Sequence, residues 1–154
     1  MQGVQVLCGI FPMMLEPIRV VIVDDHSGVR AGIRYILVNA KDINVVGEGA
    51  NGVEAVQLAS THKPDVMLLD VELPLLKGDE AVRVIKDNHP EVKVLAVSSY
   101  SDHQYIQAMM ANGASGYITK DEVPEFLLEA VRSIYNENHT WLSPLANRIN
   151  RFGG

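Results

Sequence analysis

Short runs of apolar, largely β-branched residues alternate with segments of helical periodicity, and this alternation limits the fold more than any other feature of the chain. The apolar runs predict buried strands at 18–23, 43–46, 66–69, 92–97 and 116–119. Apolar residues at helical spacing predict helices at 27–37, 52–60, 79–88, 102–112 and 124–135. Strands and helices that alternate in this way form a parallel sheet covered on both faces, so the sequence predicts a doubly wound α/β domain.

Residues that favour helix ends support these boundaries. Ser27 and Asn51 stand at the starts of helical segments and are expected to be N-caps. Gly113 stands just past the fourth helix, where a left-handed residue is common. Pro90 follows the third helix, and Pro124 lies in the first turn of the fifth.

The composition is that of a soluble globular domain. The 154 residues are 47% hydrophobic, which is enough apolar material for one core. With 13 basic and 19 acidic residues the net charge is −6, which disfavours direct binding to nucleic acid phosphates. Cys8 is the single cysteine, so a disulfide framework and a cysteine-based zinc site are excluded, and a reducing cytoplasm is expected.

The two ends of the sequence are interpreted separately from the predicted domain at 18–136. No segment is long enough to span a bilayer, and the apolar run before Glu16 lacks the basic residues of a secretory signal. We interpret residues 1–17 as an N-terminal extension or a mis-assigned start, with Met13 or Met14 as the natural start. Residues 137–154 are interpreted as a tail or the start of a linker, with a short candidate helix at 145–149.

Polar residues close every predicted strand except the second. Asp24 and Asp25 follow the first strand, Asp70 the third, Ser98 the fourth and Lys120 the fifth. Any one of them alone is more often a turn or cap residue. The carboxyl ends of parallel strands share one edge of the sheet, however, and open α/β sheets bind ligands there. Three carboxylates at that edge repel one another and favour a hard cation such as Mg²⁺, while the lysine suits a phosphate group.

The segments that carry these residues resemble the receiver domains of two-component response regulators. They read Val-Val-Ile-Val-Asp-Asp-His at 20–26, Val-Met-Leu-Leu-Asp at 66–70, Val-Ser-Ser at 97–99 and Gly-Ala-Ser-Gly-Tyr-Ile-Thr-Lys at 113–120. The resemblance covers residues 18–135. It implies a flavodoxin-like (βα)5 fold with strand order 2-1-3-4-5.

The resemblance also implies a phosphorylation site with a magnesium ion. Asp70 would accept the phosphoryl group as a carboxylate nucleophile. Asp25 and Asp70 would coordinate Mg²⁺ directly and Asp24 through water. The backbone carbonyl of Glu72 would complete the protein ligands.

Three further residues are expected to contact the phosphoryl group or to respond to it. Ser98 would hydrogen-bond its oxygens, and Lys120 would pair with them. Tyr117 matches the aromatic switch position, whose ring turns inward when Ser98 is drawn to the phosphate. The domain would then relay a signal from a sensor histidine kinase, catalysing only its own phosphorylation and dephosphorylation.

The sequence departs from the common receiver-domain pattern at two positions, and one of these departures indicates a particular group of response regulators. Asp121 follows Lys120 where many members have proline, and Leu73 replaces a methionine. Asp121 and the Trp-Leu-Ser-Pro segment at 141–144 resemble NarL/FixJ-type regulators, in which a LuxR-type helix-turn-helix follows a linker. These 154 residues contain no such domain, so DNA binding is expected only through an output domain beyond them. A homodimer through the fourth and fifth helices, or the first and fifth, is also expected.

Alternative functions rest on fewer residues. Gly47, Gly49 and Gly52 match a dinucleotide-binding fingerprint, with Asp70 as the later acid. An aspartate-nucleophile phosphohydrolase could use Glu72 as its acid, but the sequence has no insertion that could form a substrate-binding cap. A flavin-binding protein is a further alternative, but the acidic loop after the first strand would repel the phosphate of the flavin in the absence of a metal ion. The histidines, including His26 and His139, show no ligand spacing and are interpreted as surface residues. Met109 and Met110 are assigned to helix packing.

Overall fold

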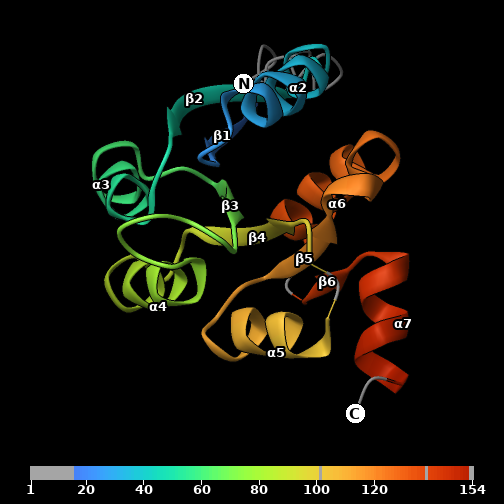
Figure 1. Cartoon of the computed structure of the whole chain (residues 1–154). Helices are drawn as coiled ribbons and strands as arrows, with labels where there is room; N and C mark the ends of the chain where they lie inside the picture. Colours follow the sequence, from blue (N-terminus) through green and yellow to red (C-terminus); the bar gives the residue numbers. More distant parts are fainter. Residues whose placement is uncertain (1–15, 101, 138, 153–154) are drawn as a thin grey trace, which may run out of the picture.

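The computed structural model describes residues 16–100, 102–137 and 139–152 (Figure 1). Cys8, Met13 and Met14 lie outside the described residues. The strands are β1 (Ile18–Val23), β2 (Ile43–Gly49), β3 (Val66–Asp70), β4 (Lys93–Ser98), β5 (Gly116–Thr119) and β6 (Trp141–Leu142). The helices are α2 (Ser27–Val38), α3 (Gly52–His62), α4 (Gly78–Asn88), α5 (His103–Ala111), the 3₁₀ turn η1 (Lys120–Glu122), α6 (Val123–Asn136) and α7 (Pro144–Phe152). Within the described part of the chain, no helix is both long and apolar enough to cross a membrane.

The sheet is parallel throughout and has the order β2-β1-β3-β4-β5-β6. The predicted order of the first five strands is therefore confirmed, but the prediction of five strands was one strand short. The sixth comes from the segment interpreted as a tail or linker. There the Trp141 amide donates to the Ser115 carbonyl at 2.9 Å, and the Ser143 amide donates to the Tyr117 carbonyl at 3.0 Å.

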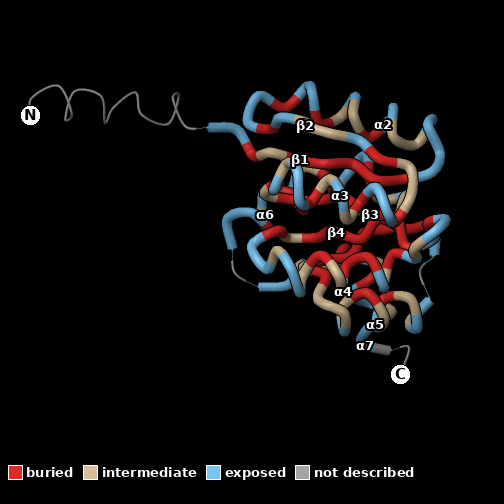
Figure 2. Tube along the Cα trace, turned by 90° about the vertical axis from the view of Figure 1, so that its left-hand side faces the viewer, coloured by how far each residue is buried: buried red, intermediate tan, exposed pale blue. Residues whose placement is uncertain are grey.

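The helices cover the two faces of the sheet in two groups. Helices α3, α4, α5 and α7 pack on one face, and α2 and α6 pack on the other. Neighbouring strand residues point to opposite faces: Val21 and Val23 join the first cluster, whereas Val20 and Ile22 join the second. Figure 2 shows the consequence, with the inner strands β1, β3 and β4 buried between helices whose outer sides are exposed. The continuous apolar runs in the sequence reflect this burial on both faces.

The predicted helix ends hold with one exception. Asn51 caps α3, since its Oδ1 accepts from the Glu54 amide at 2.8 Å. Gly113 has a φ of 109°, as expected past the end of α5. The prediction that Ser27 is an N-cap was wrong: Ser27 is the first residue of α2, and the preceding His26 makes no side-chain cap bond. The turn η1, between β5 and α6, was not predicted.

Candidate functional site

The register of the sheet brings the predicted strand-end residues to one edge. Asp70 is the last residue of β3 and pairs in register with Val97, so Ser98 lies one residue further along β4. Ser98 is in register with Thr119, and Lys120 follows directly. Asp24 follows the end of β1, which pairs with β3. We call this edge the acidic rim.

Four side chains of the acidic rim are close enough to share one cation. Ligand atoms of Asp24, Asp25, His26 and Asp70 all lie within 4.8 Å of one another. Three of these residues are carboxylates, whose hard oxygens are the donors that Mg²⁺ prefers. The donor set therefore fits a magnesium ion.

Lys120 lies between the two buried carboxylates. Its Nζ is 2.8 Å from Asp24 Oδ2 and 3.2 Å from Asp70 Oδ2. Asp24 and Asp70 are 2% and 4% exposed, so these pairs are largely shielded from water. Burial acts to lower the pKa of Lys120, but the two carboxylates outweigh it, and the pKa of Lys120 is raised. The lysine thus stays charged and offsets part of the repulsion between the acids.

Asp70 is the carboxylate most strongly affected by its surroundings. Burial is the largest cause, and the charge of Asp24 adds to it, so the pKa of Asp70 is raised to about 6. Lys120 and the Glu72 amide, which donates to Asp70 Oδ1 at 3.1 Å, act in the opposite direction. The Glu72 amide thus contacts Asp70, while the role of the Glu72 carbonyl as a magnesium ligand stays a prediction.

His26 is a residue of the acidic rim that the sequence analysis missed. Its amide donates to Asp24 Oδ1 at 2.9 Å. Its Nδ1 lies 3.0 Å from Asp25 Oδ1 and 3.3 Å from Asp24 Oδ1. The ring is largely exposed, as predicted, but it is in contact with the acids. Its position directly after Asp24 and Asp25 was the only available signal.

Ser98 is the residue of the acidic rim at the end of β4, and Tyr117 lies on the neighbouring strand β5. Ser98 is buried, and its Oγ accepts from the Tyr100 amide at 2.9 Å. The Tyr117 ring is already turned inward, with no exposed area, and its hydroxyl donates to the Tyr100 carbonyl. Burial chiefly raises the pKa of Tyr117 to about 12, so the hydroxyl stays protonated.

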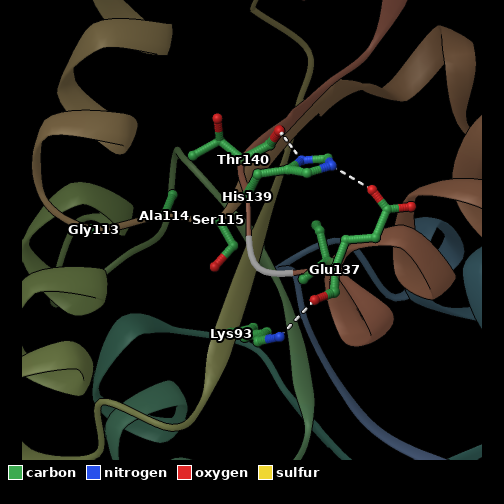
Figure 3. A pocket seen from close by; sticks show the side chains of 8 residues that line it. Lys93, Gly113, Ala114, Ser115, Glu137, His139 and Thr140 are labelled. Atoms are coloured by element: carbon green, nitrogen blue, oxygen red, sulfur yellow. Dashed lines mark hydrogen bonds and ion pairs between the residues drawn. The ribbon is translucent and has the colours of Figure 1, made fainter.

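A cavity of about 260 Å³ lies at the opposite edge of the sheet, near the start of β4 and β5 (Figure 3). Its charged groups already have partners within the chain. Lys93 donates to the Ile134 carbonyl at 2.8 Å, and His139 pairs with Glu137. His139 is 63% exposed, in agreement with its interpretation as a surface residue.

The glycine fingerprint before α3 does not form a dinucleotide site. The Gly52 amide donates to the Pro74 carbonyl at 3.2 Å, so the loop after β3 covers the start of α3. A Cβ at position 52 would lie 1.9 Å from the Leu76 carbonyl oxygen. Glycine is needed here because the chain's own backbone approaches, and a pyrophosphate has no room beside this amide.

Comparisons with known proteins agree with this arrangement. The sequence family described as the response regulator receiver domain matches residues 20–132. The chain is 38% identical over 117 residues to transcriptional regulatory protein DegU of Brevibacillus brevis, over 76% of this chain and 50% of DegU. It is 38% identical over 136 residues to oxygen regulatory protein NreC of Staphylococcus aureus, over 87% of this chain and 63% of NreC. The chain thus spans between half and two thirds of the length of these curated relatives.

A solved structure extends the similarity to the fold. The crystal structure of a LuxR-family two-component response regulator from Aurantimonas has a TM-score of 0.84 to this chain and 29% sequence identity. The alignment covers 88% of this chain and 96% of that one. Sequence, sheet order and the residues of the acidic rim thus lead to one family, and the chain belongs to the response regulator receiver domains.

Proposed function

We propose that this domain accepts a phosphoryl group on Asp70 and relays the event to an output domain outside these 154 residues. The observation that carries the proposal is the contact of Lys120 with both Asp70 and Asp24 at the carboxyl ends of the strands. A nucleophilic carboxylate, a fixed cation and further acid ligands are the groups that phosphoryl transfer to aspartate needs.

In the proposed reaction one carboxylate oxygen of Asp70 forms a bond to phosphorus. The bond from phosphorus to the donor breaks, and its electron pair leaves with the donor. With a phosphohistidine of a sensor kinase as donor, the leaving imidazole nitrogen then takes a proton from water. Lys120 would move its contact from the Asp70 carboxylate to the phosphoryl oxygens, and the Ser98 hydroxyl would donate to them.

Asp25, Asp70 and the Glu72 carbonyl would hold Mg²⁺, with Asp24 acting through water. When bound, the ion lowers the repulsion between the carboxylates and the incoming phosphoryl oxygens. It would also favour the ionised form of Asp70, whose pKa is otherwise raised to about 6. Since phosphorylation requires the carboxylate form, this gives the cation a direct part in activating Asp70.

The names of the relatives favour a transcriptional output, reached through DNA binding by a separate domain in the cytoplasm.

We also expect a homodimer to form through α2 and α6 and not through α5 and α6. The reason is that α7 and β6 of the same chain already cover α5 and the edge of β5. Sedimentation velocity with and without beryllofluoride, a mimic of the phosphoryl group, measures this association.

Intact-mass measurement tests the phosphorylation site. Acetyl phosphate with Mg²⁺ should add one hydroxylamine-labile phosphoryl group to the wild-type chain. The Asp70→Asn variant should gain none, and Asp87→Asn, which changes an exposed aspartate of α4, should be labelled like the wild type. Equal labelling of wild type and Asp70→Asn would refute the assignment.

A further inference from the structure

We propose that Glu122 is a positioning residue that couples the acidic rim to the C-terminal segment, defined here as β6 and α7 (141–152). The inference rests on the proposed function, because it starts from a change in the contacts of Lys120. It concerns the path by which that change leaves the domain. The path consists of three consecutive residues, Lys120 to Glu122, that form the turn η1.

The two oxygens of the Glu122 carboxylate hold two different elements. Oε1 accepts from the Thr119 amide at 3.2 Å and from the Thr119 hydroxyl at 2.9 Å, which fixes η1 to the end of β5. Oε2 accepts from the Leu145 amide at 3.0 Å. Leu145 is the second residue of α7, and the first, Pro144, has no amide hydrogen to donate. Glu122 thus supplies a charged acceptor to the start of α7.

The C-terminal segment is packed tightly enough to respond to a movement of η1. Ala146 and Ser143 are fully buried, and the Ser143 hydroxyl accepts from the Ala146 amide at 3.1 Å. A Cβ on Gly116 would lie 2.6 Å from the Trp141 carbonyl oxygen, so β6 can pack this closely against β5 only because residue 116 is glycine. Packed elements of this kind shift as units and do not deform gradually.

The other end of η1 carries the group that senses the rim. Lys120 is the first residue of η1, and its Nζ contacts Asp24 and Asp70. The coupling requires that the backbone of Lys120 and the rest of the short turn adjust when the Lys120 Nζ turns to phosphoryl oxygens on Asp70. Glu122 then transmits the adjustment to the first turn of α7, which is the part of the domain that the proposed output domain would follow.

Hydrogen exchange measured by mass spectrometry, with and without beryllofluoride and Mg²⁺, tests the coupling on the full chain. In the wild type we expect beryllofluoride to change the exchange rates of α7 amides by about threefold or more, together with a change in the loop after Asp70. In Glu122→Ala the loop should respond as before, but the response of α7 should be lost. Glu125→Ala, at an exposed position of α6, is the matched control and should behave like the wild type.

A second variant distinguishes loss of the coupling from unfolding of α7, which could also follow from Glu122→Ala. Thr119→Val removes the hydroxyl contact with Glu122 but leaves the bond from Glu122 to Leu145 in place. In this variant the α7 amides should stay protected from hydrogen exchange, while the change in their exchange rates on adding beryllofluoride should become smaller. An unchanged α7 response in both variants, or a wild-type rim that responds without α7, overturns the coupling. A wild-type rim that does not respond at all overturns the proposed function and the coupling with it.

Discussion

At the scale of single residues, the carboxylates of the acidic rim repel one another, and the charge of Lys120 offsets part of this repulsion. Asp24 and Asp70 are buried beside each other, and one lysine contacts both. Asp25 is different, because about a third of its side chain is exposed and its Oδ1 lies 3.0 Å from Nδ1 of the exposed His26 ring. Asp25 can therefore be removed without leaving a buried charge unpaired, which makes it the best position for testing the metal site.

We predict that Asp25→Ala removes Mg²⁺ binding and leaves the fold intact. In the wild type, Mg²⁺ at about a hundred times its Kd should stabilise the domain by about 2.7 kcal/mol through linkage. The variant should show no such rise in melting temperature, and its metal-free form should melt no lower than the wild type, because one repelling charge is gone. Asp87→Ala is the control. A Mg²⁺-dependent rise that survives Asp25→Ala would contradict the ligand role.

At the scale of elements, the turn η1 and helix α7 depend on one carboxylate. Burial acts to raise the pKa of Glu122, but hydrogen bonds from Ser143, Leu145 and Thr119 outweigh it and lower that pKa. The folded state therefore favours the ionised form more than the unfolded state does. By linkage, the contribution of Glu122 to stability is present above its ordinary pKa of 4.5 and is lost as the pH falls through the lower folded value.

We predict that acid loosens the C-terminal segment through Glu122. The difference in melting temperature between wild type and Glu122→Gln should be largest near neutral pH and shrink below pH 4.5. Trp141 is the only tryptophan in the sequence and lies in β6, so its fluorescence reports on the same segment. A difference that stays constant across this range would show that the charge of Glu122 does not stabilise α7.

At the scale of the whole molecule, the C-terminal segment completes the sheet. Without it, the backbone groups of β5 would form an open edge next to α5. Ala146 joins the same apolar cluster as Tyr117, and the half-buried Leu142 and Ile149 pack against that cluster. The segment is therefore a structural part of the domain, although the family match ends at residue 132.

We predict that a chain ending at Asn136 is less stable than one ending at Phe152. Loss of the apolar contacts made by Trp141, Leu142, Ala146 and Ile149 should cost about 3 kcal/mol. That cost corresponds to a melting temperature lower by about 10 °C. The exposed edge of β5 should also promote self-association, which light scattering detects. Equal melting temperatures of the two chains would show that the C-terminal segment does not contribute to the stability of the domain.

The sequence by itself determined the first five strands of the sheet and the residues at their carboxyl ends. Buried strands appear as continuous apolar runs, and parallel connections bring every strand end to one side, so Asp24, Asp70, Ser98 and Lys120 could be grouped without coordinates. Gly113 and Asn51 were predictable for a different reason, since helix capping depends only on neighbouring residues. These features are encoded locally, in patterns a few residues long.

Only the tertiary structure decided the contacts between distant segments. Strand β6 has two residues, too few for a periodic signal, and its partner Ser115 lies far back along the chain. The role of Gly52 depends on a loop that follows the next strand, and the bond from Leu145 to Glu122 spans 23 positions. Hydrogen-bond geometry and steric exclusion act through space, so these relations arise only when folding brings the partners together.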